Sequence, residues 1–86
     1  MRYTVELRPA AQRALNKLPA TEARRILSKF TLLAEDPFPA GSKKLAGTDW
    51  YRLRVGDYRI IYSVENARLL VLIIRIGHRR EVYRGL

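Results

Sequence analysis

A Gly-Asp dipeptide at positions 56 and 57, between two runs of alternating apolar and polar residues, restricts the fold more than any other feature. Such a dipeptide is typical of the type I′ or II′ turn of a tight β-hairpin. The flanking runs therefore predict two antiparallel strands, Trp50–Val55 and Tyr58–Val64. A two-residue turn also fixes how the strands pair, because residues at equal distances from the turn lie opposite each other.

This pairing determines which side chains share a face of the hairpin. Arg54 is predicted to lie opposite Arg59, and Arg52 opposite Ile61. Because directly opposed residues share a face, one face carries the residues expected in a core: Tyr51, Leu53, Val55, Tyr58, Ile60 and Tyr62. The other face, called the arginine face below, carries Trp50, Arg52, Arg54, Arg59, Ile61 and Ser63.

The rest of the chain combines helical and strand patterns. Alternation predicts a strand over Arg2–Leu7, and apolar spacings of three and four predict helices over Pro9–Leu18 and from a Thr21 cap to Asp36-Pro37. We expect a loop over residues 36–49, a turn over Glu65–Arg68, a buried strand over Leu69–Ile76 that Gly77 ends, and a short element over Arg79–Tyr83. The order β-α-α-β-β-β predicts one α+β domain over residues 1–86, with both helices on one face of an antiparallel meander.

The net charge indicates an anionic partner. The chain has 17 Lys and Arg residues against 8 Asp and Glu residues, which gives a formal charge of +9. Such an excess is typical of domains that bind nucleic acid or acidic proteins, although it also increases solubility. Basic residues on the second helix, such as Arg24 and Arg25, are more typical of a solvated face.

Other functions are restricted by what the sequence lacks. It has no cysteine and one histidine, so disulfides and thiolate metal sites are excluded, and a histidine-rich metal site has too few ligands. We therefore expect no cofactor. The apolar run Leu69–Ile74 is far shorter than the roughly 20 residues of a spanning helix, so we expect a cytoplasmic protein without a membrane partner.

Three arginines on one hairpin face indicate an anion site. Like charges directly opposite each other destabilise a sheet, so folding alone does not favour Arg54 opposite Arg59. A bound polyanion converts this repulsion into charge-assisted contacts, and guanidinium groups bind phosphate with two prongs. The alternative is that Asp49, Asp57 or Glu81 neutralises the cluster internally.

The C-terminal segment adds candidates for the same site. His78, Arg79, Arg80 and Tyr83 follow the long strand and are expected near the same sheet. His78 has either a structural role or a role in proton transfer, and Tyr83 either packs in the core or contacts a nucleotide.

These residues together resemble a known family. Lys44-Leu45-Ala46-Gly47, the segment Tyr51 to Tyr62, and Ile76-Gly77-His78-Arg79-Arg80-Glu81-Val82-Tyr83 resemble, in order and spacing, the RelE side of the RelE/ParE toxin superfamily. The segments Leu15–Pro19 and Glu35–Pro37 fit as well, so the resemblance covers essentially the whole chain. It implies a toxin of a type II toxin–antitoxin module with a fold akin to microbial ribonucleases.

The resemblance also implies an activity. RelE-like toxins cut messenger RNA in the ribosomal A site without a metal, by attack of a ribose 2′-hydroxyl on the adjacent phosphate. Arg52 and Arg54 match the basic pair beside that phosphate, Arg59 matches a phosphate-binding arginine, Arg79 an arginine at the leaving group, and Tyr83 a tyrosine that orients a nucleotide. Further RNA contacts are expected from Lys43, Lys44, Trp50 and Arg80. The implied partners are the ribosome, messenger RNA and a RelB-like antitoxin with an acidic segment that folds on binding. Operator DNA is reached only through the antitoxin complex.

One departure from the family pattern concerns proton transfer. Lysines are usual where this chain has Arg52 and Arg54, and arginine stays protonated, so it does not act as a base. Either the arginines stabilise the pentavalent phosphate electrostatically, or another group takes the proton, for which His78 is the candidate. Two other functions are a ParE-like toxin that inhibits DNA gyrase without cutting RNA, and a basic module that binds RNA without catalysis.

Overall fold

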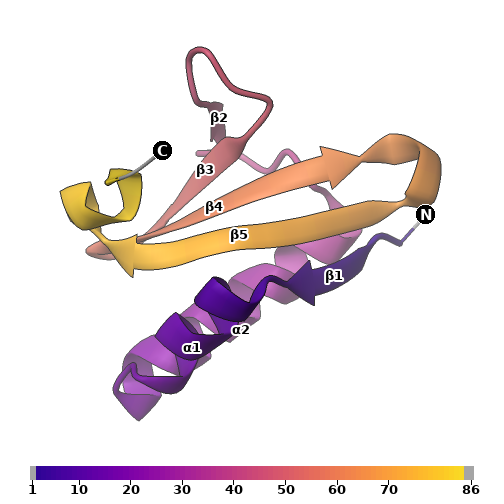
Figure 1. The fold of residues 1–86 in the computed structure, drawn as a ribbon. Coiled ribbons are helices and arrows are strands. Elements are labelled where there is room, and N and C mark those ends of the chain that lie inside the picture. Colours follow the sequence, from indigo (N-terminus) through magenta and orange to yellow (C-terminus); the bar gives the residue numbers. More distant parts are fainter. Residues whose placement is uncertain (1, 85–86) are drawn as a thin grey trace.

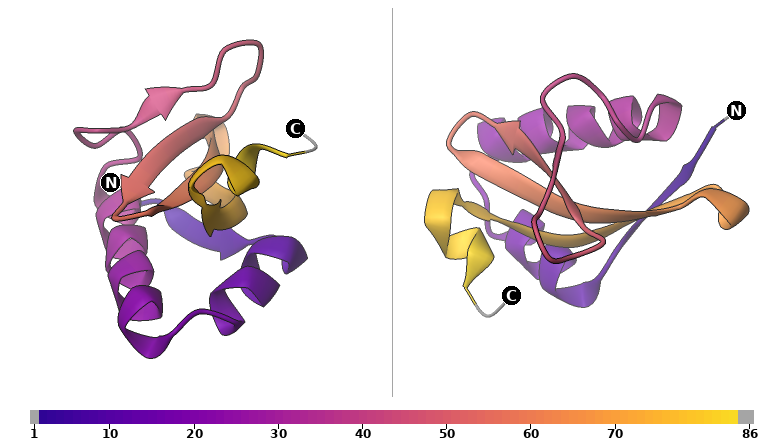
Figure 2. Two further views of the ribbon diagram at one scale, coloured as in Figure 1. Left: turned by 90° about the vertical axis from the view of Figure 1, so that its left-hand side faces the viewer. Right: turned by 90° about the horizontal axis from the view of Figure 1, so that it is seen from above.

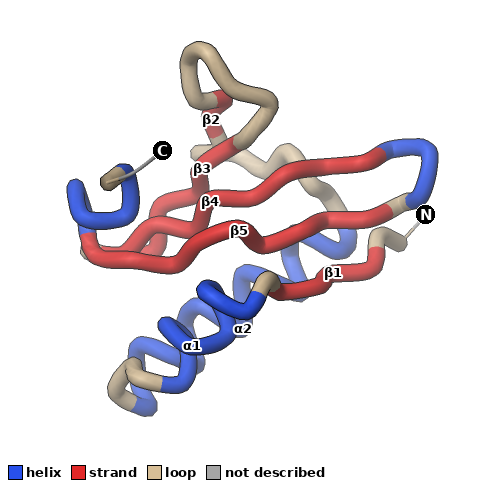
Figure 3. Tube along the Cα trace, viewed as in Figure 1, coloured by secondary structure: helices blue, strands red, loops and turns tan. Residues whose placement is uncertain are grey.

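The chain folds into one five-stranded sheet with two helices on one side of it. The structure is a computed structural model that describes residues 2–84, with the backbone alone described at 79 and 80. In chain order the strands are β1 (Thr4–Leu7), β2 (Lys43–Lys44), β3 (Tyr51–Val55), β4 (Tyr58–Glu65) and β5 (Leu70–His78). They lie in the order β1-β5-β4-β3-β2, with β1 parallel to β5 and the other pairs antiparallel (Figure 3). The predicted α+β class and antiparallel meander are confirmed.

Both helices form where the apolar spacing predicts them. Helix α1 (Pro9–Asn16) starts at a proline, whose missing N–H is not needed in a first turn, and buries Ala11 and Leu15. Helix α2 (Ala20–Glu35) buries three residues spaced by four and three: Ile26, Phe30 and Leu33. The predicted Thr21 cap is wrong, because the N-cap is Pro19, two residues earlier, and the helix begins at Ala20.

The helices create the main core. Figures 1 and 2 show α1 and α2 beneath one face of the sheet. The face of the hairpin that packs against the helices, called the helix-side face below, is the one predicted to carry the core residues. Leu53, Val55, Ile60 and Tyr62 are buried there. Within the described residues, no helix is long and apolar enough to cross a membrane.

Two expectations about the strands are wrong. Lys43 and Lys44 pair with β3 as a two-residue edge strand instead of lying in a loop, which a segment so short does not reveal by periodicity. Gly77 does not end β5, because its backbone pairs with Arg59 and the strand continues to His78. The turn predicted over Glu65–Arg68 is confirmed, and it takes the form of a short 3-10 helix, η1 (Asn66–Arg68), with Glu65 as its N-cap.

The C-terminal element is a 3-10 helix, η2 (Arg79–Tyr83), which confirms a short element at these residues. In Figure 1 it lies at the end of β5, on the side of the sheet away from α1 and α2. Its Val82 is buried with Ile61 and Ile74 in a second, smaller apolar cluster. The two clusters occupy opposite faces of the sheet, and the smaller one lies on the arginine face.

Candidate nucleic-acid site on the arginine face

The predicted hairpin register is confirmed. Arg54 pairs with Arg59, Arg52 pairs with Ile61, and Val55 pairs with Tyr58 across the turn. Gly56 has a φ of +60°, whereas Asp57 has no positive φ, so the turn is of the II′ kind. Because directly opposed residues share a face, Arg52, Arg54 and Arg59 all lie on the face away from the helices.

Arg59 is the most unusual of these arginines. Its Nη1 atom is buried, and among the described residues no atom accepts a hydrogen bond from it. A buried donor without a partner costs about 1–3 kcal/mol, and more when it is charged. Native proteins rarely keep such an atom, so its presence beside two further arginines indicates a site for an anion that is not part of the chain.

Three glutamates form ion pairs with arginines outside the arginine face. Ion pairs join Arg2 to Glu35 at 2.9 Å, Arg25 to Glu22 at 3.8 Å and Arg68 to Glu65 at 3.3 Å. Glu22, Arg25 and Glu35 belong to α2, Glu65 ends β4 and Arg68 belongs to η1. The excess of positive charge on the arginine face is therefore not balanced by these three glutamates.

Two aromatic residues border the arginines. Trp50 and Tyr83 are half-buried and pack against the small cluster of Ile61, Ile74 and Val82. Trp50 is fixed by the preceding turn, where its N–H donates to Thr48 Oγ1 at 3.0 Å and its carbonyl accepts from Leu45 N–H at 2.9 Å. Aromatic rings beside guanidinium groups are typical of surfaces that bind single-stranded nucleic acid.

Gly77 explains how η2 approaches the sheet. It lies opposite Arg59, and a Cβ at this position would be only 3.1 Å from Val82 Cβ and 3.2 Å from Val82 Cα. The lack of a side chain therefore lets η2 fold back onto β5. This close packing brings Tyr83 to the arginine face.

His78 lies on the other face. It pairs with Tyr58 of the helix-side face, and the two rings meet edge to face with centroids 5.2 Å apart and planes at 84°. The expectation that His78 joins the arginines is wrong, because Gly77 takes the position opposite Arg59 and the next residue points to the opposite side. The side chains of Arg79 and Arg80, also predicted for this site, lie outside the described residues.

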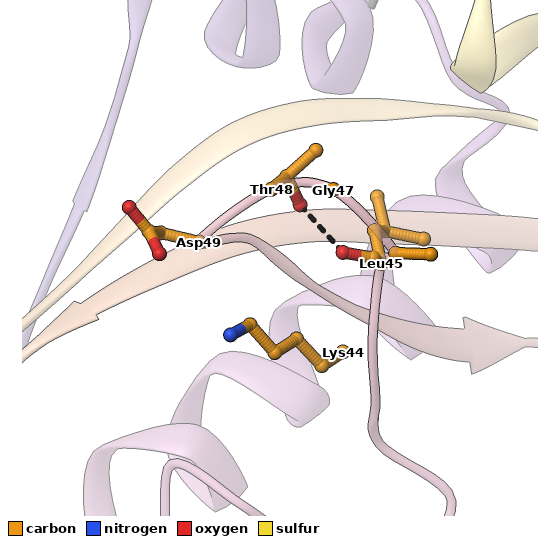
Figure 4. Close-up of a pocket in the computed structure, with 6 residues that line it drawn as sticks. Lys44, Leu45, Gly47, Thr48 and Asp49 are labelled. Atoms are coloured by element: carbon orange, nitrogen blue, oxygen red, sulfur yellow. Dashed lines mark hydrogen bonds between the residues drawn. The ribbon is translucent and has the colours of Figure 1, made fainter.

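The two lysines of β2 are separated in the same way. Lys43 pairs with Arg52 and so lies on the arginine face, whereas Lys44 pairs with Tyr51 on the other face. Lys44 lines a hollow of about 390 Å³ along the turn from Leu45 to Asp49, in which the Thr48 hydroxyl donates to the Leu45 carbonyl (Figure 4). Of these two lysines, both predicted to contact RNA, Lys43 is therefore the one on the face of the arginines.

Sequence reasoning missed Arg75. It lies within the apolar run of β5, but it pairs with Ile61 and so lies on the arginine face. The cause is a bulge, since Ile74 is an extra residue between the pairs Tyr62–Ile73 and Ile61–Arg75. The only signal in the sequence is a charge inside an otherwise apolar strand.

Tyr62 supports the loop that leads to β2. Its ring is fully buried, and its hydroxyl donates to the carbonyl of Pro37 at 2.8 Å. Burial, with smaller effects from the nearby Tyr51 and Asp36, raises the pKa of Tyr62 to about 12. This tyrosine is a structural anchor on the helix-side face.

Among the side chains that the structure describes, no group of three or more His, Cys, Asp or Glu residues could hold a metal ion.

The chain is similar to known toxins over nearly its whole length. The family model for the ParE toxin of the type II toxin–antitoxin system parDE matches residues 5–83. Toxin RelG of Mycobacterium tuberculosis is 34% identical over 88 residues, which cover 98% of this chain and 99% of that protein. The mRNA interferase toxin RelE of Escherichia coli K12 is 29% identical over 87 residues, covering 96% and 92%.

A solved structure agrees with these sequence matches. A chain of the archaeal RelE–RelB complex from Pyrococcus horikoshii superposes with a TM-score of 0.83 at 36% identity, covering 93% of this chain and 98% of the other. The fold and the matches together define a small toxin of a type II toxin–antitoxin system. Within that class, the chain belongs to the RelE/ParE superfamily and is RelE-like, which confirms the resemblance found in the sequence.

Proposed function

We propose that this toxin is an endoribonuclease that cuts messenger RNA in the ribosomal A site. The observation that carries the proposal is the buried Nη1 of Arg59, which has no hydrogen-bond partner among the described residues, on a face that also holds Arg52 and Arg54. A backbone phosphate supplies the oxygen acceptor that the Arg59 donor lacks, and its negative charge suits the neighbouring arginines. The name of the Escherichia coli relative, an mRNA interferase toxin, supports the same activity.

The proposed reaction is a phosphoryl transfer within the RNA. The ribose 2′-oxygen attacks the adjacent phosphorus, the bond from phosphorus to the 5′-oxygen breaks, and the products are a 2′,3′-cyclic phosphate and a free 5′-hydroxyl. Arg52, Arg54 and Arg59 stabilise the negative charge that develops on the pentavalent phosphorus. Arg79 stabilises the leaving oxygen, which takes a proton from solvent to become the 5′-hydroxyl, and Tyr83 stacks on a neighbouring base.

Electrostatic stabilisation is the main effect that we assign to the chain. Arginine stays protonated at neutral pH, so none of the three acts as a base. His78 lies on the helix-side face beside Tyr58, so we assign it no proton transfer, and the 2′-proton passes to solvent. The variant His78→Gln is expected to cut messages at a rate within about twofold of wild type, and a loss of 100-fold or more would restore His78 as acid or base.

We expect cleavage to depend on the ribosome, because the site offers few side chains that could orient the RNA for attack. Catalysis by charge and stacking requires that the substrate already has an in-line geometry, and the ribosome holds the A-site codon. We propose that no metal takes part, because the chain presents guanidinium groups to the phosphate, and these supply the positive charge that a cation would otherwise provide. This substrate places the toxin in the cytoplasm.

A RelB-like antitoxin is the proposed partner. The similar Pyrococcus horikoshii chain was solved as a RelE–RelB complex. A segment rich in Asp and Glu that folds on binding complements the charge of +9, and we expect it to cover the arginine face or to displace η2. Operator DNA is reached through the antitoxin. A complex with the arginine face open and unchanged would argue against direct blocking.

One assay distinguishes this function from inhibition of DNA gyrase, the alternative that the ParE family model favours. Ribosomes programmed with a defined message are incubated with the toxin, and primer extension maps cuts across the A-site codon, while a supercoiling assay runs in parallel. Cut messages with normal supercoiling support the proposal. Intact messages with inhibited supercoiling support the gyrase alternative.

The variant Arg59→Lys separates catalysis from simple RNA binding. It keeps the charge but loses the planar fork of N–H donors, so we expect a fall in cleavage of at least about tenfold. Cleavage and toxicity equal to wild type would mean that charge alone suffices. That result would favour a basic module that binds RNA without a catalytic site.

A further inference from the structure

Arg75 makes contacts that differ from those of the other arginines on this face. It is half-buried in β5, opposite Ile61 and diagonal to Arg59. Its Nη1 donates to the carbonyl of Val82 at 3.2 Å and also to the carbonyl of Arg84. These two carbonyls belong to the residues immediately before and after Tyr83.

We propose that Arg75 is the positioning residue for Tyr83. One guanidinium nitrogen carries two N–H donors, and here each holds one of the carbonyls on either side of the tyrosine. The backbone of Tyr83 is thereby fixed at two points from the sheet beneath it. The inference rests on the proposed function, because it concerns a tyrosine that we expect to orient RNA.

The C-terminal segment needs such a contact. Element η2 spans only five residues, and a 3-10 helix of this length has poor internal hydrogen bonds. One of these bonds runs from Arg84 N–H to the Glu81 carbonyl at 3.2 Å, and segments near a terminus fray unless they are tied down. The carbonyls at the end of a helix lack partners within it, and a cation beside them forms charge-assisted bonds.

Two further contacts hold η2 against the sheet, and both are apolar. Val82 packs against Gly77, and Tyr83 itself is half-buried against the apolar cluster. Apolar packing is not directional, so it brings the tyrosine to the site without fixing the angle of its ring. Hydrogen bonds are directional, and a misplacement of about 1 Å in a catalytic arrangement can slow a reaction about 100-fold.

The first test asks whether Arg75 acts through Tyr83. Single-turnover cleavage on programmed ribosomes is measured for wild type, Arg75→Met, Tyr83→Ala and the double variant. If Arg75 only positions the tyrosine, Arg75→Met slows cleavage about 10-fold or more, and the double variant is no slower than Tyr83→Ala within about twofold. If the double variant is slowed by the product of the two single effects, Arg75 acts on the phosphate by its own charge.

Matched variants control for charge. Arg68→Met removes an arginine of the η1 turn, at the opposite end of β5, where its partner is the exposed Glu65 (Figure 1). We expect it to cut at the wild-type rate. Arg75→Lys keeps the charge and has N–H donors, but its ammonium lacks the planar guanidinium fork that holds the Val82 and Arg84 carbonyls, so it should behave like Arg75→Met. We call this pair of hydrogen bonds the clamp, and full activity of Arg75→Lys together with fast hydrogen exchange at residues 81–84 would overturn the clamp in favour of charge.

Amide hydrogen exchange of the free toxin tests the clamp without using activity. Arg75→Met should exchange at least about 10-fold faster than wild type at residues 81–84, while β4 stays protected in both, which also shows that the variant is folded. Unchanged exchange at these residues would overturn the inference, whatever the cleavage results. Faster exchange combined with a wild-type toxin that cuts no message would leave the clamp standing and overturn the proposed function.

Discussion

Replacing Arg59 by methionine should make the protein more stable and inactive. Methionine keeps a long apolar side chain in the same place but removes the buried Nη1 that has no partner among the described residues. Removing an unsatisfied buried donor is worth about 1–3 kcal/mol, and relief of the repulsion from the opposed Arg54 adds about 0.2–1 kcal/mol. Because the methionine also loses some packing, we expect a net gain of about 1–2 kcal/mol in the free energy of unfolding.

Thermal and urea unfolding measure this gain. For a domain of this size, about 1–2 kcal/mol corresponds to a rise in Tm of roughly 5–10 °C. Arg68→Met, which removes an exposed arginine on the η1 turn, should change Tm by less than a third as much. Cleavage by Arg59→Met should fall by about 100- to 1,000-fold, as when one preorganised donor to a transition state is lost.

Inorganic phosphate provides a second measure of the same site. An anion that binds the folded toxin at Arg59 raises its stability by about 1.4 kcal/mol at ten times the Kd, and this effect should be absent in Arg59→Met. If Arg59→Met is less stable than wild type at neutral pH, Arg59 serves the fold and not a ligand. That result would refute the link drawn here between the unpaired donor and an anion site.

Three further variants test the elements that support the site. Gly77→Ala places a Cβ 3.1 Å from Val82 Cβ, so we expect a loss of about 1–3 kcal/mol in urea unfolding and faster hydrogen exchange in η2, and a stability equal to wild type would contradict the close packing. Gly56→Ala puts a side chain at a φ of +60° and 3.0 Å from the Arg25 guanidinium, which should lower the free energy of unfolding by about 1–2 kcal/mol, as the urea midpoint measures. Tyr62 has a pKa of about 12 when folded and 10.0 when unfolded, so its stabilising effect is full below pH 10 and is lost between pH 10 and 12, by up to about 1.4 kcal/mol per pH unit. Stability measured against pH should therefore fall less steeply in this range for Tyr62→Phe than for wild type, and parallel curves would contradict the burial effect.

The hairpin and its charge pattern could be predicted because local rules determine them. A two-residue turn at Gly56-Asp57 leaves one register, and that register assigns Arg52, Arg54 and Arg59 to one face without knowledge of the rest of the fold. The helices followed in the same way from apolar spacing, with errors confined to their ends.

The C-terminal half of the site could not be predicted in this way. The bulge at Ile74 shifts the alternation along β5, and neither glycine nor proline marks it in the sequence. The face of His78 and the role of Arg75 depend on that shift and on how η2 folds back, which are contacts between elements and not properties of a local pattern.

A message with one altered sugar tests the central claim most directly. Two messages are compared on programmed ribosomes, one entirely ribonucleotide and one with a single 2′-deoxynucleotide at the A-site position whose sugar supplies the attacking oxygen. Attack by the 2′-hydroxyl under the arginines predicts that wild-type toxin cuts the first message and leaves the second intact. Equal cutting of both messages would contradict the mechanism, and cutting of neither would contradict the nuclease itself.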